Sequence, residues 1–292
     1  MILILILMVI LLMIQNRFKK NLMESFTGHN INHIWMYWEN KPGKTKPNFL
    51  KLCFDTVRKH CSKNFKIHLL NENTITNYIS DLRLDLNDKL SIQQKTDYLR
   101  IKLLHKYGGI WLDSDTIVMT DLSEIISKLD KYDFVGFGCH YRDCSNGGYP
   151  KPANWVMASR KNGKLMKLCI DESNRLLDNT SNQDMKKSYF KIGRELIWNK
   201  IDYLLNNDKT WSYYHYPSTC LERDSNGRKL RNHISLSNED IDKKCYDKHL
   251  FIPIYNTAPG FPDWFINMSK KDILSDNMLI SKTFRKSLGI KL

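Results

Sequence analysis

Two aspartates separated by a single serine, Asp113 and Asp115, follow directly on the short apolar run 110–112. Carboxylate oxygens are hard donors, and paired carboxylates at the end of a strand are typical ligands of Mg²⁺ or Mn²⁺. The triplet alone does not decide between a metal site and an ordinary solvated turn in a charged loop. Its interpretation therefore depends on the elements that surround it.

The helix predicted in front of this triplet carries a second pair of charged residues. Apolar side chains at helical spacing predict an amphipathic helix over 91–107, which Gly108 and Gly109 would end. Asp97 and Arg100 are three residues apart on it and therefore lie on one helical face. Such a pair is either a surface ion pair or a recognition element for a polyol, whose hydroxyls both donate and accept hydrogen bonds.

The order of the predicted elements indicates an α/β fold with a mostly parallel sheet flanked by helices. The predicted strands are 31–38, 65–70, 110–112, 116–119, 134–137, 154–158 and 251–255, the predicted helices are 48–60, 91–107, 121–131, 164–177 and 188–205, and 179–184 is expected to be a loop. In open sheets of this class, ligands bind beyond the carboxyl ends of the strands. Asp113 and Asp115 therefore lie where a ligand is expected. No internal repeat or linker divides the chain, so a single domain over 30–292 is expected.

The run from Lys95 to Asp115 resembles the signature of the DXD sugar-transferase superfamily. The matching residues are Lys95-Thr96-Asp97-Tyr98-Leu99-Arg100, Leu103-Leu104 and Tyr107-Gly108-Gly109-Ile110-Trp111-Leu112-Asp113-Ser114-Asp115. That superfamily includes the capsular polysaccharide synthesis proteins, yeast-type mannosyltransferases and the glucosyltransferase domains of large clostridial toxins. Segments 34–39, 154–155 and 158–159 are similar to the capsular synthesis family in particular, and the resemblance covers 31–170.

The resemblance implies a GT-A fold and a metal-dependent glycosyltransferase. Such an enzyme would move a hexose-type sugar, with retention of configuration, from a nucleotide-diphosphate sugar to a glycan, lipid or protein acceptor. By the same resemblance, Asp115 would bind Mn²⁺ (or Mg²⁺), and Asp113 would contact the ribose or a metal-bound water. Asp97 and Arg100 would hold the transferred sugar.

The nucleotide side of the site is less well marked. The resemblance places Trp35 beside the nucleobase, where its ring would stack, although a core aromatic on the first strand is an equal interpretation. Asn73 is a second candidate for contact with the base or ribose. In relatives, a residue in the C-terminal part of the chain completes the contacts to the metal or the diphosphate. His249, Asn256 and Trp264 are candidates for this residue, and no motif selects one of them.

The charge balance favours anionic partners. Lys and Arg number 45 against 31 Asp and Glu, which gives a net charge of +14 and attracts nucleic acid, an anionic lipid surface or a phosphorylated substrate. No RNP, zinc-finger or basic-zipper pattern is present, so a nucleic-acid partner is not expected.

Two alternatives to a glycosyltransferase remain open. A metal-dependent phosphoryl or nucleotidyl transfer enzyme would need a third acidic ligand, for which Asp121 is the nearest candidate. A basic, membrane-tethered binding protein with a degenerate site is the other alternative, and the intact Asp97, Arg100, Asp113 and Asp115 argue against it.

The N-terminal segment is expected to associate with a membrane. Residues 1–14 are unbroken apolar sequence, shorter than the ~20 residues that span a bilayer, and basic residues follow them. A cleaved signal peptide has the opposite order of charge. We therefore expect a hydrophobic anchor over 1–20, and its basic flank slightly favours the cytosolic face. Two glycosylation sequons, which matter only in a lumen, leave this orientation open.

Overall fold

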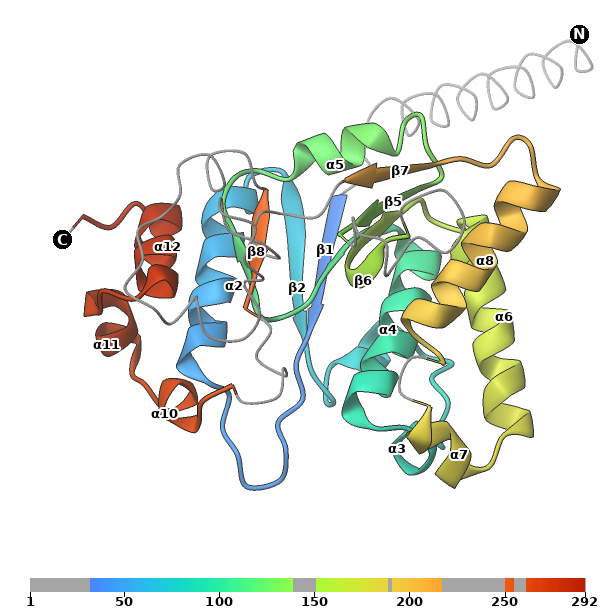
Figure 1. Ribbon diagram of the computed structural model, residues 1–292, viewed down its shortest axis with the longest axis horizontal. Coiled ribbons are helices and arrows are strands. Elements are labelled where there is room, and N and C mark those ends of the chain that lie inside the picture. The colour runs from blue at the N-terminus through green and yellow to red at the C-terminus, as the bar shows by residue number, and fades with distance from the viewer. Residues whose placement is uncertain (1–31, 139–150, 189–190, 217–249, 255–260, 292) are drawn as a thin grey trace, which may run out of the picture. The chain divides into compact units, whose positions relative to one another are not determined.

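The computed structural model describes residues 32–138, 151–188, 191–216, 250–254 and 261–291 (Figure 1). The expected anchor 1–20 and the candidates His249 and Asn256 lie outside these ranges. No helix within the described ranges is both long enough and apolar enough to cross a bilayer.

A six-stranded sheet in the order β2-β1-β3-β6-β5-β7 forms the centre of the fold. Its strands are β1 (Asn32–Tyr37), β2 (Phe65–Leu70), β3 (Gly109–Leu112), β5 (Phe134–Phe137), β6 (Ala153–Ser159) and β7 (Tyr213–Tyr216). Strand β3 runs parallel to β1, and β5 runs parallel to β7. Strand β6 is antiparallel to both of its neighbours, so the expected α/β class is confirmed with a sheet that is mixed.

The reversed direction of β6 matters for the site. Leu112, at the end of β3, is opposite Val156, near the start of β6. An antiparallel strand begins where its neighbour ends. Asn154 is consequently carried to the carboxyl end of β3, where Asp113 and Asp115 follow.

Alternating side chains of the central strands bury the two faces of the sheet in separate cores. Trp35 and Trp111 belong to one core, and Ile34 and Ile110 to the other. All four have no exposed surface. Burial on both faces explains why these strands read as continuous apolar runs.

Helices cover both faces of the sheet (Figure 1). The longer ones are α2 (Asn48–Cys61), α4 (Ile92–Tyr107), α6 (Lys164–Asn179), α8 (Arg194–Asn207) and α12 (Leu279–Leu288). The shorter ones are α3 (Leu86–Lys89), α5 (Ser123–Lys128), α7 (Asn182–Lys187), α10 (Asp263–Ile266), α11 (Lys270–Ser275) and the 3₁₀ turn η1 (Ile75–Asn77). Helices α4, α6 and α8 pack on the Trp35 face, whereas α2 and α5 pack on the other.

Segment 179–184, expected to be a loop, instead contains the start of α7. Ser181 is the N-cap of this helix, and its hydroxyl accepts a hydrogen bond from the Asp184 amide. Serine at this position satisfies an amide that the first helical turn leaves unpaired. The next helix begins at Arg194 rather than at residue 188.

A small second sheet joins the C-terminal part of the chain to the strand that follows the aspartate pair. It consists of β4 (Thr116–Val118) and β8 (Phe251–Pro253), which are antiparallel. A third core beneath it contains Phe49 of α2, Phe265 of α10 and Phe284 of α12. The C-terminal helices thus pack on α2 rather than on the central sheet.

Candidate active site

Helix α4 is fixed at its N-terminal end by a reciprocal cap. The Ser91 hydroxyl accepts from the Gln94 amide at 3.3 Å, and the Ser91 amide donates to Gln94 Oε1 at 3.0 Å. The buried Gln94 side chain also donates to the carbonyl of Met185 at 2.7 Å. These bonds hold the first turn in place, and Asp97 and Arg100 follow within the next turn.

Gly108 and Gly109 turn the chain from α4 into β3. Both have positive φ, 71° and 97° respectively, which favours glycine. A Cβ atom at Gly108 would lie 2.6 Å from the Lys161 amide nitrogen, and one at Gly109 would overlap the carbonyl oxygen of His33 on β1. The predicted helix end is confirmed, and the glycines also allow β3 to approach β1 closely.

Arg100 connects the carboxylates of Asp97 and Asp113 in one buried network. Its Nη2 lies 3.0 Å from Asp97 Oδ1 and 3.2 Å from Asp113 Oδ1, and its Nη1 donates to the carbonyl of Asn154. Asn154 Nδ2 donates to Asp97 Oδ1 at 2.7 Å, and Trp111 Nε1 donates to Asp113 Oδ1 at 2.8 Å. The guanidinium also lies over the Trp111 ring, 5.1 Å from its centroid. The interpretation of Asp97 and Arg100 as a surface ion pair is therefore excluded.

Two carboxylates share this one guanidinium, and burial makes their negative charge unfavourable. The pKa of Asp97 is raised to about 6: burial is the largest cause and the charge of Asp113 adds to it, whereas Arg100 and the hydrogen bond from Asn154 oppose it. Burial likewise raises the pKa of Asp113, although Arg100 and the Trp111 indole favour its charged form. A hydroxyl donor or a further cation near the pair would be stabilised by this excess of negative charge.

The central serine of the triplet holds the turn to the end of β1. Ser114 is buried, and its hydroxyl donates to the carbonyl of Tyr37 at 2.7 Å. The amide of Asp113 donates to the carbonyl of Trp155 on β6 at 2.8 Å, and the carbonyl of Asp115 accepts from the amide of Ile254 at 2.9 Å. Three distant segments thus fix the backbone that carries the two carboxylates.

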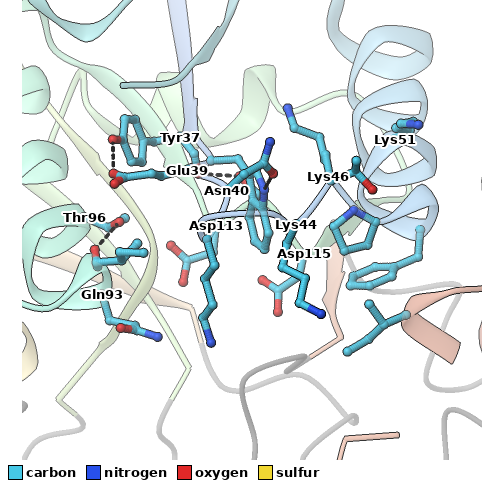
Figure 2. A pocket seen from close by; sticks show the side chains of 18 of the residues that line it. Tyr37, Glu39, Asn40, Lys44, Lys46, Lys51, Gln93, Thr96, Asp113 and Asp115 are labelled. Carbon is cyan, nitrogen blue, oxygen red and sulfur yellow. Dashed lines mark hydrogen bonds between the residues drawn. The ribbon is translucent and has the colours of Figure 1, made fainter. Parts of the chain in front are cut away.

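Asp97, Arg100, Asp113 and Asp115 line one pocket of about 1070 Å³. Its walls are formed by the residues after β1, the N-terminal turns of α2 and α4, the start of β6 and part of α10. Figure 2 shows the carboxylates of Asp113 and Asp115 in the middle of this pocket. The site lies beyond the carboxyl ends of β1 and β3, as the fold class predicts.

The donor set of this pocket suits a divalent cation that shares its ligands with a substrate. Among the described residues, no three His, Cys, Asp or Glu side chains are grouped to hold a metal ion. The carboxylates of Asp113 and Asp115 line this pocket together with those of Glu39, Asp97 and Asp263. Mg²⁺ and Mn²⁺ commonly bind to one or two carboxylates and complete their shell with water and substrate phosphates.

Trp35 and Asn73 do not line this pocket. Trp35 has no exposed surface, stacks on His68 with ring centroids 4.0 Å apart, and donates from Nε1 to the carbonyl of Gly108 at 2.9 Å. Asn73 is exposed in a turn, where its amide donates to Asn71 Oδ1 at 3.0 Å. Trp38, one residue after β1, lines the pocket instead.

The remaining candidates lie at or outside the rim. Trp264 on α10 is 56% exposed, and its neighbour Asp263 lines the pocket. Asp121 does not line the pocket. Its carboxylate accepts hydrogen bonds from Asn64 Nδ2 at 3.1 Å and from the Ser123 amide at 2.8 Å. Asn154 is the main site residue that spacing alone does not reveal, since it reaches Asp97 only through the reversed strand β6.

The chain belongs to the family described as capsular polysaccharide synthesis protein, whose profile matches residues 10–217. The matched range includes α4, β3 and every residue of the Arg100 network. The protein is accordingly a glycosyltransferase, as the resemblance implied. No curated protein matches the chain.

Several solved glycosyltransferases share part of the fold. The PaToxG glycosyltransferase is 16% identical, with a TM-score of 0.45 over 60% of this chain and 70% of that one. The glycosyltransferase GlyE of Streptococcus pneumoniae TIGR4 is 16% identical, with a TM-score of 0.36 over 64% of this chain and only 45% of its own. A glycosyltransferase involved in glycosylation of the major capsid of PBCV-1 is 14% identical, with a TM-score of 0.39 over 77% of this chain and 94% of that one. Sequence identities and TM-scores as low as these give no information about the substrates of this chain.

Proposed function

We propose that this glycosyltransferase is metal-dependent and transfers a hexose-type sugar from a nucleotide-diphosphate sugar to a glycan, lipid or protein acceptor. The observation that supports this best is the buried Asp97–Arg100–Asp113 network, which lines the same pocket as Asp115. A polyol ligand fits such a site, because one wall accepts hydrogen bonds through carboxylates and donates them through a guanidinium.

Asp97 and Arg100 hold the transferred sugar in this proposal. Both are nearly buried, at 7% and 5% exposure, so bonds to sugar hydroxyls form where little water competes. Asn154 donates to Asp97 Oδ1 and leaves Oδ2 to accept from a hydroxyl. The network thereby orients the sugar ring relative to Asp113.

Asp113 and Asp115 hold Mn²⁺ or Mg²⁺ in this proposal. When bound, the ion would neutralise charge on the diphosphate of the donor. Arg100 and Trp111 both engage Oδ1 of Asp113, so its Oδ2 is the atom left for the ribose or a metal-bound water. Asp115, half-buried at the centre of the pocket, presents its carboxylate as the direct metal ligand.

The base-stacking role fits Trp38 better than Trp35. Trp35 lacks exposed surface and can influence the site only through packing, whereas Trp38 lines the pocket beyond β1. The Trp38 indole donates to Asn40 Oδ1 at 2.7 Å, which holds the ring in one orientation. An aromatic face held in this way offers a nucleobase a stacking surface at little loss of side-chain entropy.

A phosphoryl or nucleotidyl transfer enzyme is a poorer fit to the described pocket. That chemistry uses clustered carboxylates to hold two metal ions. Asp121, the third acid that the sequence offers, bonds to Asn64 and Ser123 instead of lining the pocket. Of the acids that line the pocket, Asp97 and Asp113 share Arg100, which suits sugar recognition, and Glu39 pairs with Lys95.

The test is turnover of a panel of UDP- and GDP-sugars with and without Mn²⁺. We expect hydrolysis or transfer of one donor that requires the metal and falls at least about 100-fold in Asp115→Asn. Asp130→Asn, an exposed aspartate outside the pocket, is the matched control. Donor turnover that persists in EDTA, or that Asp115→Asn leaves intact, would contradict the proposed role of the metal.

Retention of configuration, the outcome that the resemblance implies, has a separate test. Proton NMR of the first product released from the active donor distinguishes the two anomers directly. We expect the anomer of the donor to be kept. An inverted product would remove this part of the proposal and leave the metal and sugar assignments standing.

A further inference from the structure

One wall of the pocket is basic. Lys41, Lys44, Lys46 and Lys51 all line it, the first three from the loop after β1 and the last from the first turn of α2. We refer to these four residues as the lysine wall. Figure 2 shows Lys44, Lys46 and Lys51 on the side of the aspartate pair opposite Gln93 and Thr96 of α4.

None of the four ammonium groups of the lysine wall forms an ion pair with a carboxylate among the described residues. Those of Lys41 and Lys44 make no ion pair or hydrogen bond there, and both side chains are exposed. Lys51 Nζ donates to the neutral Asn48 Oδ1 at 3.0 Å, and Lys46 Nζ lies 4.6 Å from the centroid of the Phe54 ring.

The nearest acid along the chain is already engaged elsewhere. Glu39 forms an ion pair with Lys95 of α4 and accepts a hydrogen bond from the Tyr37 hydroxyl at 2.7 Å. These contacts hold its carboxylate on the α4 side of the pocket, as Figure 2 shows for Tyr37 and Glu39. Glu39 therefore does not neutralise the lysine wall.

Like charges in the wall disfavour one another. Burial lowers the pKa of Lys46, and Lys51 and Arg58 lower it further, against an opposing effect of Glu72. A bound anion would remove this repulsion, since each ammonium gains from an opposite charge within a few ångströms.

The N-terminus of α2 adds to the positive potential of the same wall. This helix has 14 residues, no acidic residue in its first turn, and no side chain that caps its amides. Its N-cap residue is Pro47, and the side chain of Asn48 in the first turn donates to the carbonyl of Met268 at 3.0 Å. The amides at a helix N-terminus carry partial positive charge and favour anions.

We propose that the lysine wall binds the diphosphate of the donor and takes up the charge that develops on the nucleoside diphosphate as it leaves. This inference rests on the proposed function. It adds four residues outside the aspartate motif that bind the leaving nucleoside diphosphate. In the transfer, the bond from the anomeric carbon to the β-phosphate oxygen breaks, and its electron pair stays on that oxygen. The acceptor hydroxyl oxygen bonds to the anomeric carbon and releases its proton. The diphosphate thus gains one negative charge beside the lysines.

The test is binding of UDP and GDP, with UMP, GMP and the uncharged nucleosides, to the full chain by calorimetry, in Mn²⁺ and in EDTA. The variant Lys44→Ala/Lys46→Ala removes half of the wall. We expect about a 10- to 100-fold loss of diphosphate affinity in both buffers, a smaller loss for the monophosphate and none for the nucleoside. The dependence of diphosphate affinity on salt should also decrease.

Two further variants make this result specific. Lys44→Arg/Lys46→Arg keeps the charge and should restore most of the affinity. Lys63→Ala/Lys66→Ala removes two exposed lysines that do not line the pocket and should bind as the wild type does. A loss of affinity in this control equal to that of Lys44→Ala/Lys46→Ala would indicate a general charge effect and overturn the assignment.

The outcomes separate this inference from the proposed function. Equal diphosphate affinity in the wild type and in Lys44→Ala/Lys46→Ala, with a raised KM for the acceptor, would show that the wall serves an anionic acceptor, and would overturn the inference alone. If Mn²⁺ strengthens diphosphate binding to Asp115→Asn as much as to the wild type, the proposed metal site is wrong. A loss of affinity in Lys44→Ala/Lys46→Ala measured in EDTA would still support the lysine wall. If no nucleoside diphosphate binds the wild type, both the proposed function and the role of the lysine wall are wrong.

Discussion

Asp97 is the residue at which proton binding and folding are most directly coupled. Burial raises its pKa to about 6 in the folded chain, above the value of an exposed aspartate. The folded state therefore binds this proton more tightly than the unfolded state does. Its contribution to stability is fully present below about pH 4 and is lost as the pH rises through about 6.

We expect Asp97→Asn to remove this pH dependence. The free energy of unfolding of the wild type, relative to that of Asp97→Asn, should fall by about 2 kcal/mol between pH 4 and pH 7, at ~1.4 kcal/mol per pKa unit. Urea denaturation at several pH values measures it, with the exposed Asp130→Asn as the control. A relative stability that rises with pH would show that Arg100 outweighs burial at this carboxylate.

Trp111 contacts the site through one hydrogen bond and through the face of its ring. Its indole donates to Asp113 Oδ1, and replacement with Phe keeps an aromatic ring beneath Arg100 while removing that donor. A hydrogen bond to a charged group contributes about 1.5–3 kcal/mol. We expect Trp111→Phe to lower kcat/KM for the donor about 10-fold or more.

Trp211→Phe is the matched control for that substitution. Trp211 is also a buried tryptophan, but its indole nitrogen has no hydrogen-bond partner within the part of the chain that the structure describes. The two variants should lose similar stability in thermal melts while only Trp111→Phe loses activity. Equal kcat/KM in both variants would mean that the Trp111 hydrogen bond does not position Asp113.

At the scale of elements, the turn into α8 limits the space around Asp97. A Cβ atom at Gly193 would overlap Asp97 Oδ2 and lie 3.0 Å from Asn154 Nδ2. Since Arg100 and Asn154 both hold the Asp97 carboxylate, it cannot move aside without breaking a bond of the network. The start of α8 thus packs directly against the Asp97 carboxylate.

We predict that Gly193→Ala lowers donor turnover about 10- to 100-fold while the protein remains folded. The φ of Gly193, −92°, lies outside the left-handed region, and an added Cβ atom would meet the Asp97 carboxylate. Steady-state kinetics with circular dichroism as a check of folding measures it. Turnover equal to that of the wild type would show that the position of Asp97 is not critical.

Local patterns predicted the elements that carry the site, and tertiary contacts determined the rest. The helix expected over 91–107 is observed over Ile92–Tyr107, and the glycine turn and strand β3 follow it as expected, because caps, glycines and apolar spacing act within a few residues. The roles of Asp97, Arg100, Asp113 and Asp115 stay predictions, now with a geometry that brings them together. Asn154 could not be found by spacing, since only the reversed direction of β6 brings it to Asp97.

At the scale of the whole molecule, the net charge of +14 is spread along the sequence rather than gathered at the pocket, whose lining holds five basic and five acidic side chains. The basic residues after the apolar run 1–14 are suited to an anionic lipid surface. An apolar segment of that length and a basic flank together hold a chain on a membrane more firmly than either does alone.

We predict that the full chain sediments with membranes and that removal of residues 1–20 releases it into the soluble fraction with its donor turnover unchanged. The comparison is cell fractionation of both forms at low and at high salt. A variant in which Arg17, Lys19 and Lys20 are replaced by alanine separates the charge from the apolar segment. If the shortened chain stays on membranes at low salt and leaves them at high salt, the net charge rather than the anchor is responsible.

The hydrogen bond from the Ile254 amide to the Asp115 carbonyl has a consequence for the newly made protein. The aspartate pair is synthesised before the middle of the chain, yet β4 has its partner only when β8 is present. A ribosome must therefore have made the chain as far as residue 254 before the turn at Asp115 reaches its final form. Until then a nascent chain carries the aspartate pair without the strand that completes its backbone support.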